Sequence, residues 1–328
     1  MDNELRGAWV MAEATPRWRT LLVALALLLG PAAPAQTLVR EVRAAIGKGD
    51  YTQAEARIAK YRDASGVTSE MLEAQSWLGR AALAAKQLDR AESYAVETHK
   101  LALELLKTRR LDDDVRLPLA LGAAIEVQAQ VIGARGERGV AIEFLQRELR
   151  AYQGTSIRTR IQKNINLLSL EGQRAPDIEI REWLGSKPAS LSSIKGRAVL
   201  LFFWAHWCGD CKYQAPILAR LEREFGPQGL LLVGPTQRYG YVAGGQEAAP
   251  PDESRYIDEI RKRFYGDLPA MPVPVSEENF KRYGASTTPT LVLIDRQGLV
   301  RMYHPGRMPY EELAPRIEAV LAGRPGSS

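Results

Sequence analysis

Two cysteines, Cys208 and Cys211, are the residues of this chain whose type and spacing most directly suggest chemistry. The sequence contains no other cysteine, and only Gly209 and Asp210 separate the pair. At this spacing the sulfurs can close a small disulfide ring, so the pair can cycle between dithiol and disulfide. A bridge across so short a loop contributes little to stability. The pair is therefore predicted to be redox-active.

A buried strand is predicted directly before the pair and a helix directly after it. Residues 198–204 form the continuous apolar run typical of a strand buried on both faces, and a helix is expected from about Cys211 to Phe225. The N-terminus of a helix offers unpaired N–H groups and a partial positive charge, which favour a thiolate. Cys208, before the helix, can be exposed, whereas Cys211 lies in its first turn. We therefore assign Cys208 as the nucleophile that attacks a substrate disulfide and Cys211 as the residue that resolves the mixed disulfide.

Other uses of a cysteine pair fit this sequence less well. Zinc normally takes four ligands, and His99, His206 and His304 stand isolated. Haem attachment requires a histidine directly after the second cysteine, where this chain has Lys212. The peroxidatic pattern Pro-x-x-x-Thr-x-x-Cys is also absent at Cys208. We expect no metal and no cofactor other than the disulfide itself.

The chain around the pair alternates between predicted strands and helices. A long loop rich in Gly, Ala and Pro is expected at 235–252. The further elements expected are strands at 230–233, 290–295 and 299–303, and helices at 254–265 and 310–321. This alternation, closed by a hairpin and a helix, predicts an α/β sandwich.

The residues around the cysteines resemble a known family. Residues 203–212 resemble the active-site segment of the thioredoxin superfamily, and residues 188–197 resemble its TlpA-like branch of exported thiol–disulfide reductases. Residues 287–295 resemble the family's cis-proline segment. The resemblance covers roughly 172–323. It implies a thioredoxin fold, in which helices flank a mixed central sheet.

The resemblance also implies roles for individual residues. Pro289 would be the cis-proline beside the disulfide, where it would leave the backbone of Thr288 free to pair with an extended substrate strand. Cys208 and Cys211 would carry the reaction. The expected supporting residues are Trp207, Gly209, Asp210, Thr288 and Pro289.

The sequence departs from the family at acidic positions. Phe202 stands where thioredoxin proper has a buried acid, and Gln214 stands where many TlpA-like reductases have a glutamate. Both acids assist proton transfer at the buried cysteine. Asp210 lies inside the motif, where proline is common; it is either a substitute proton acceptor or a helix-start acid favoured by the helix dipole.

The preceding residues, 36–171, are helical in pattern. The segment around Ala54 resembles the segment around Ala91, and a third candidate runs through Ala141. Small residues at repeated positions allow antiparallel helices to pack closely, as in tetratricopeptide repeats. We predict a tetratricopeptide-like domain that binds a protein partner, with a generic helical bundle as the alternative.

The N-terminus predicts export. Arg17 and Arg19 precede an apolar run at 21–29, and Ala33 and Ala35 offer the small residues that signal peptidase reads. We expect cleavage after Ala35. The run is short for a bilayer span, so a membrane anchor is the less favoured alternative. Met11 could be the true start of the chain.

These features divide the 328 residues into a signal peptide at 1–35, a helical domain at 36–171 and a thioredoxin-like domain at 172–328. The net charge of +5 is scattered, which argues against a nucleic-acid partner. The predicted protein is a periplasmic thiol–disulfide oxidoreductase that reduces protein disulfides and receives electrons from a membrane donor. A dithiol oxidase or isomerase, and a helical-repeat binding protein with a regulatory thioredoxin-like domain, remain as alternatives.

Overall fold

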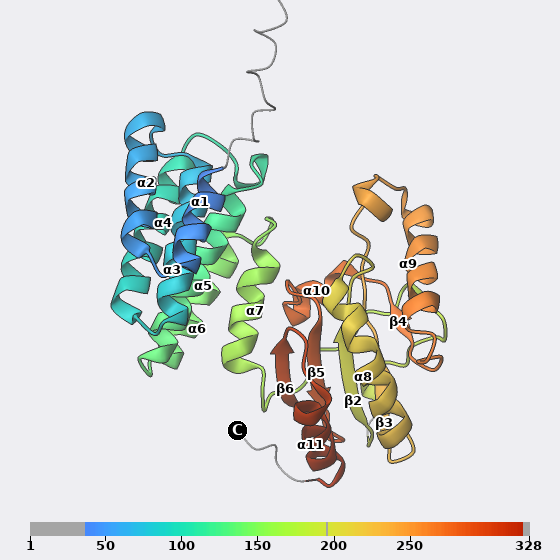
Figure 1. The fold of residues 1–328 in the computed structure, drawn as a ribbon. Helices are drawn as coiled ribbons and strands as arrows, with labels where there is room; N and C mark the ends of the chain where they lie inside the picture. The colour runs from blue at the N-terminus through green and yellow to red at the C-terminus, as the bar shows by residue number, and fades with distance from the viewer. Residues whose placement is uncertain (1–36, 195, 324–328) are drawn as a thin grey trace, which may run out of the picture. The chain divides into compact units, whose positions relative to one another are not determined.

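The computed structural model describes residues 37–194 and 196–323 (Figure 1). The predicted signal peptide and its cleavage site lie outside these residues. From Leu38 onward the chain forms one compact unit, which begins with helices and continues into an α/β part.

Helices occupy the chain between Leu38 and Ser169, which confirms the predicted all-α region. They are α1 (Leu38–Gly47), α2 (Tyr51–Ser65), α3 (Ser69–Ala84), α4 (Leu88–Leu106), α5 (Leu117–Ala134), α6 (Arg138–Ala151) and α7 (Arg158–Ser169), with a short 3-10 helix at Leu111–Asp113. Consecutive helices pack against each other, as in α1 with α2, α3 with α4, and α5 with α6. We refer to residues 38–169 as the helical region.

Small residues allow these helices to approach closely. Ala54, Ala91 and Ala141, which the repeat pattern aligns, are all fully buried and lie in α2, α4 and α6. Gly79 of α3 packs on α4, where a Cβ atom at this position would lie 3.7 Å from the carbonyl oxygen of Ala91. The aligned positions are therefore close-packing positions. The tetratricopeptide-like assignment itself stays a prediction.

Helix α5 is the most apolar element of the helical region. Within the described residues it is the one helix long and apolar enough to cross a membrane by length and composition, and 56% of it is buried inside the structure. A core helix of a folded domain meets the same criteria, so this finding carries no further conclusion.

The α/β part is built on a four-stranded sheet in the order β3-β2-β5-β6, in which β2 and β3 are parallel and the other pairs antiparallel (Figure 1). These strands are β2 (Ala198–Phe203), β3 (Leu230–Val233), β5 (Thr290–Ile294) and β6 (Val300–Pro305). A small antiparallel pair is formed by β1 (Trp183–Leu184) and β4 (Val273–Pro274). The helices are α8 (Gly209–Phe225), α9 (Pro250–Phe264), α10 (Glu277–Tyr283) and α11 (Tyr310–Leu321), with short 3-10 helices at Leu191–Ile194 and Ala243–Gly245.

Strand β2 lies inside the sheet and is buried along its whole length, as the continuous apolar run predicted. Because side chains alternate along a strand, β2 contributes to two cores. Leu200 and Phe202 join the core that includes α8 and α11, whereas Leu201 and Phe203 join the core that includes α10. The end of β2, which leads to the cysteines, is thus fixed from both sides.

Two helices of the α/β part differ from the sequence prediction: one begins earlier than expected, and one was not predicted. Helix α9 begins at Pro250, inside the stretch predicted as loop, because proline is favoured in the first turn, where its missing N–H is not needed. The sequence pattern also did not predict α10. Its seven residues are too few to show a helical period, but Ser276 caps its start and Gly284, with φ +59°, ends it.

Helix α7 packs on the α/β part. A Cβ atom at Gly284 would lie 2.3 Å from the backbone nitrogen of Lys163, so only glycine fits where α10 ends against α7. The side-chain amide of Asn166 donates to the carbonyl oxygen of Arg282 at 3.4 Å. These contacts attach the last helix of the helical region to the helix that covers one face of the sheet.

Candidate active site

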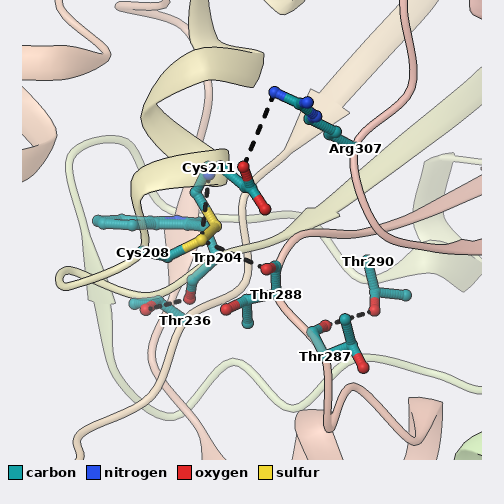
Figure 2. Close-up of a disulfide and its surroundings, with 9 residues drawn as sticks. Trp204, Cys208, Cys211, Thr236, Thr287, Thr288, Thr290 and Arg307 are labelled. Atoms are coloured by element: carbon teal, nitrogen blue, oxygen red, sulfur yellow. Dashed lines mark hydrogen bonds and ion pairs between the residues drawn. A yellow bond between two sulfur atoms is a disulfide. The ribbon is translucent and has the colours of Figure 1, made fainter. Parts of the chain in front are cut away.

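Cys208 and Cys211 are joined by a disulfide at the start of α8 (Figure 2). Cys208 is the residue that caps the helix, and its Sγ accepts a hydrogen bond from the backbone N–H of Cys211 at 3.0 Å. An N–H group at a helix N-terminus that points at sulfur stabilises negative charge on that sulfur. The structure therefore places Cys208 where its thiolate is favoured.

Cys208 is more covered than the sequence suggested. Cys211 is fully buried, as expected within the first turn, but Cys208 is only 3% exposed rather than open to solvent. The side chain beside it, Trp207, is 50% exposed. The expectation of an exposed Cys208 is corrected accordingly, because the turn before α8 packs its sulfur against a neighbouring loop.

That loop contains the segment predicted to carry the cis-proline. The peptide bond between Thr288 and Pro289 is cis. The carbonyl oxygen of Thr288 lies 3.4 Å from Cys208 Sγ, so it can accept a hydrogen bond from the thiol in the dithiol form (Figure 2). The hydroxyl of Thr290, at the start of β5, donates to the carbonyl oxygen of Thr287 at 2.7 Å and helps to hold the loop.

The residues between the cysteines make few contacts. A Cβ atom at Gly209 would meet no atom within 4 Å. The carboxylate of Asp210 is 63% exposed, and one of its oxygens lies 3.9 Å from an Arg307 nitrogen (Figure 2). Ion pairs this exposed contribute little energy. Asp210 is therefore a solvent-facing group at the helix start.

Both positions where the family has acids carry structural side chains here. Phe202 is fully buried with its ring 5.7 Å from the ring of Tyr265. The Gln214 side chain is also fully buried; it donates to the carbonyl oxygen of Met308 at 3.0 Å and accepts from the Met308 N–H at 2.9 Å. Neither side chain can exchange a proton. Gln214 instead ties α8 to the loop before α11.

Known proteins match this part of the chain. The AhpC/TSA family matches residues 171–237. Thioredoxin-like protein YneN of Bacillus subtilis is 26% identical over 152 residues, which are 45% of this chain and 79% of that protein. Thiol-disulfide oxidoreductase ResA of Geobacillus thermodenitrificans is 24% identical over 149 residues, 45% of this chain and 77% of that protein. The α/β part of the chain is therefore thioredoxin-like, and we refer to it as the thioredoxin-like domain.

A solved structure also resembles part of this chain. It is a putative thiol:disulfide interchange protein DsbE from Chlorobium tepidum, which is 27% identical, covers 46% of this chain and 97% of its own, and gives a TM-score of 0.36. These matches cover less than half of this chain.

A buried contact between a histidine and a glutamate supports the active-site turn of the thioredoxin-like domain. His206, two residues before Cys208, and Glu253 of α9 are each 1% exposed, and His206 Nε2 lies 3.4 Å from a Glu253 carboxylate oxygen. Glu253 also accepts backbone N–H groups from Tyr239 and Gly240. The pair thus joins the active-site turn, α9 and the loop after β3.

Aromatic rings enclose this pair. The rings of Tyr239, Tyr241 and Tyr256 lie 5.3–5.6 Å from the ring of His206. Burial lowers the pKa of His206, and the negative charge of Glu253 opposes this shift only in part. His206 is therefore favoured in its neutral form.

Sequence reasoning missed this support. It treated His206 as isolated because its partner is 47 positions away, in a stretch partly assigned to a loop. The available signal was the double proline at 250–251 followed by acids, which is typical of a helix start. Among the described residues, no group of three or more His, Cys, Asp or Glu could hold a metal ion.

Proposed function

We propose that this protein reduces disulfides of exported polypeptides through the Cys208–Cys211 dithiol. The observation that carries the proposal is the position of Cys208 at the N-terminus of α8, where its sulfur accepts the N–H of Cys211. This arrangement supplies a stabilised thiolate with a second thiol one helical turn away. Relatives of the thioredoxin-like domain that are named thiol-disulfide oxidoreductases support the same reaction class.

The reaction takes two exchange steps. In the first, the Cys208 thiolate attacks one sulfur of the substrate disulfide, a mixed disulfide forms, and the other substrate sulfur leaves as a thiolate. In the second, the Cys211 thiolate attacks Cys208 Sγ and the first substrate sulfur is released. Two electrons pass to the substrate, and the oxidised pair must then be reduced by a donor dithiol.

The surroundings of the pair fit a polypeptide substrate. The carbonyl oxygen of Thr288 lies beside Cys208, and Pro289 offers no N–H, so the loop can align an extended chain next to the sulfur. The exposed ring of Trp207, next to Cys208 in the chain, offers an apolar contact. We assign these residues to substrate positioning.

The cellular setting is part of the proposal. The basic and apolar pattern at 17–35 supports export to the periplasm, with cleavage after Ala35. There the donor would be a dithiol held by a membrane protein, because glutathione does not set the redox poise of that compartment. In this proposal the helical domain, 36–171, binds a protein partner and the thioredoxin-like domain, 172–328, performs the exchange.

The reaction is tested by insulin reduction coupled to dithiothreitol with the full mature chain. Wild type should accelerate the reaction, and Cys208→Ser should abolish the acceleration because no thiolate attacks. Cys211→Ser should accumulate mixed disulfides that a non-reducing gel detects. Equal rates for wild type and Cys208→Ser would refute the proposal.

The direction of electron flow is tested separately. A reductase should equilibrate at a potential below the ~−180 mV of protein disulfide isomerase. Equilibration of the full chain against glutathione mixtures, followed through the fluorescence of Trp204 and Trp207, would measure it. A value well above that reference would assign the chain to dithiol oxidation instead.

A further inference from the structure

A groove of about 1100 Å³ runs along the helical region. Side chains from α3, α5 and α7 line it, and we call it the α5–α7 groove. Its lining also includes Ser286 and Thr287 of the thioredoxin-like domain. Thr287 directly precedes Thr288, whose carbonyl oxygen lies 3.4 Å from Cys208 Sγ. The groove therefore comes close to the cysteine assigned as the nucleophile.

A smaller hollow of about 290 Å³ connects the α5–α7 groove to the active site. Trp207 and Thr288 line it on the side of the cysteines, and Thr159 lines it from α7. Ser156 and Ser286 line both the hollow and the α5–α7 groove, so the two cavities adjoin each other. An extended polypeptide that reacts at Cys208 can continue past Trp207 into the helical region.

The lining of the α5–α7 groove carries three cations and three carboxylates, and the three cations gather around one of the carboxylates, Glu126. Glu126 of α5 pairs with Arg160 at 2.6 Å and with Lys163 at 2.9 Å. Arg80 of α3 also lines the groove, and it stacks on the ring of Trp77 at 4.7 Å without an ion pair among the described residues. Two cations therefore share the carboxylate of Glu126, and Arg80 lies in the same cluster without a paired carboxylate in the described part of the chain.

The electrostatics of Arg80 agree with this arrangement. Burial, together with the like charge of Arg160, lowers the pKa of Arg80 to about 10. A cation that loses hydration and faces another cation is stabilised when a carboxylate approaches. An anionic group entering the groove would relieve both effects.

The remaining charged and apolar residues of the groove indicate what kind of ligand enters. Asp112 and Asp114 line it too, but their carboxylates accept backbone N–H groups, Asp112 from Ser156 and Asp114 from the start of α5. Val115 and Leu119 are 84% and 47% exposed along the same groove. Exposed apolar side chains beside charges are typical of surfaces that bind polypeptides rather than small anions.

We propose that the α5–α7 groove binds an acidic, extended segment of the polypeptide whose disulfide reacts at Cys208. This inference rests on the proposed function, because it names the class of polypeptide that the reaction favours. Acidic side chains of the segment pair with Arg80, Arg160 and Lys163, and its apolar side chains contact Val115 and Leu119. The helical region then selects the substrate that the thioredoxin-like domain reduces.

Binding is tested without any redox step. A fluorescein-labelled peptide of Glu and Ser residues, free of cysteine, is titrated with the full mature chain and followed by fluorescence anisotropy. Matched peptides carry Lys or Gln in place of Glu. The Glu peptide should bind about tenfold more tightly than the Gln peptide, and added salt should weaken its binding. Equal affinity for all three peptides, or preference for the Lys peptide, would overturn the inference.

Variants locate the binding site. Arg80→Gln should weaken binding of the Glu peptide about tenfold, and Arg80→Lys, which keeps the charge, should retain most of the affinity. Arg62→Gln is the matched control, because Arg62 forms an exposed ion pair with Glu97 outside the groove. Circular dichroism of each variant shows whether it is folded. Unchanged binding in a folded Arg80→Gln variant would refute the assignment.

Two further measurements test which group of the peptide is bound and separate this inference from the proposed function. Amidation of the peptide C-terminus should leave affinity unchanged, because acidic side chains are the proposed ligand; loss of binding on amidation would replace them with a terminal carboxylate and contradict the inference. Insulin reduction is measured on the same preparation. Failure of reduction with intact peptide binding would count against the proposed function alone, whereas intact reduction without selective binding would count against this inference alone.

Discussion

The helical region and the thioredoxin-like domain fill their interiors with different side chains. The largest fully buried side chains of the helical region are aliphatic, and alanines surround them. Those of the thioredoxin-like domain are aromatic. The aromatic set of the thioredoxin-like domain is Trp204, Tyr265, Tyr283, Phe202, Phe203, Phe225 and Phe280. The set of the helical region is Met71, Leu72, Leu78, Leu117 and Leu121.

The two regions also place their buried charges differently. In the thioredoxin-like domain strand β2 presents only apolar side chains to its two cores, and the buried carboxylate of Glu253 lies outside the sheet, on α9. Helices α5 and α7 instead hold Glu126, Arg160 and Lys163 partly buried in one cluster. Large aromatic side chains in a sheet fix the active-site turn with little freedom. Paired charges on helix faces instead provide sites that discriminate between ligands. In the proposed function, disulfide exchange and substrate recognition therefore fall on two regions of different construction.

The largest effect should come from removing an aromatic ring below the active site. Phe202→Ala deletes a fully buried ring that packs on Tyr265, so the free energy of unfolding should fall by about 3–5 kcal/mol. Urea unfolding monitored by circular dichroism measures this change. Tyr213→Ala, which truncates a 60% exposed ring in the same domain, is the control and should change stability by less than about 0.5 kcal/mol. Similar losses for both variants would contradict the view that the aromatic core fixes this domain.

The next effect tests the buried charges of the helical region. Glu126→Gln leaves Arg160 and Lys163 without a carboxylate and should cost about 3 kcal/mol at neutral pH. Burial alone would raise the pKa of Glu126, but the two cations outweigh it and lower the pKa to about 2. The carboxylate's contribution is therefore complete above the unfolded-state pKa of about 4.5 and is lost as the pH falls toward 2.

Urea unfolding of wild type and Glu126→Gln across that pH range checks the sign. The difference between them should shrink as the pH falls. Glu104→Gln removes an exposed ion pair to Lys107 and should show no such trend. A difference that persists unchanged at the lowest pH would show that Glu126 stabilises the fold through packing rather than charge.

Sequence reasoning reached the active site because its signals are local. Two cysteines two residues apart, an apolar run before them and a helix after them define the chemistry within 30 residues. Strand β3 and helix α11 match their predicted bounds, and β2 and β5 each end one residue earlier than expected. These four elements either show a strong periodic pattern of apolar residues or are followed by glycine or proline. Both features can be recognised in the sequence.

What the sequence could not supply depends on distant contacts. Burial of Cys208 against Thr288, and the pairing of His206 with Glu253, join residues far apart in the chain. Gln214 looked like a missing acid, yet its amide is matched to both backbone groups of Met308. No pattern in one segment reports how another segment folds onto it.

A third prediction tests close helix packing by adding volume. Ala91 of α4 is fully buried where α4 packs against α3, so Ala91→Leu should force the helices apart and lower stability by about 1–3 kcal/mol. Val96→Leu adds a methylene group at a 48% exposed position of the same helix and serves as the control, with an expected change below about 0.5 kcal/mol. Thermal unfolding distinguishes the two. A neutral Ala91→Leu would mean that the helical region is loosely packed.

The smallest effect concerns the buried histidine beside the active-site turn. Because burial lowers the pKa of His206 in the folded state, the unfolded chain binds more protons just below its own histidine pKa of about 6.5. The stability that neutral His206 provides is present above that pH and is lost as the pH falls below it. The slope should be at most about 1.4 kcal/mol per pH unit.

His206→Gln should reduce the pH dependence of the free energy of unfolding between pH values of about 6.5 and 5. Urea unfolding measures this free energy. Burial lowers the pKa of His99 in the helical region as well, so His99→Gln removes a second part of the same slope and serves as the comparison. Only the His206 variant should also alter the pH dependence of insulin reduction, because His206 lies in the turn that carries Cys208 and pairs with Glu253. If both variants shift reduction equally, the effect reflects global stability and the pair does not position the active-site turn.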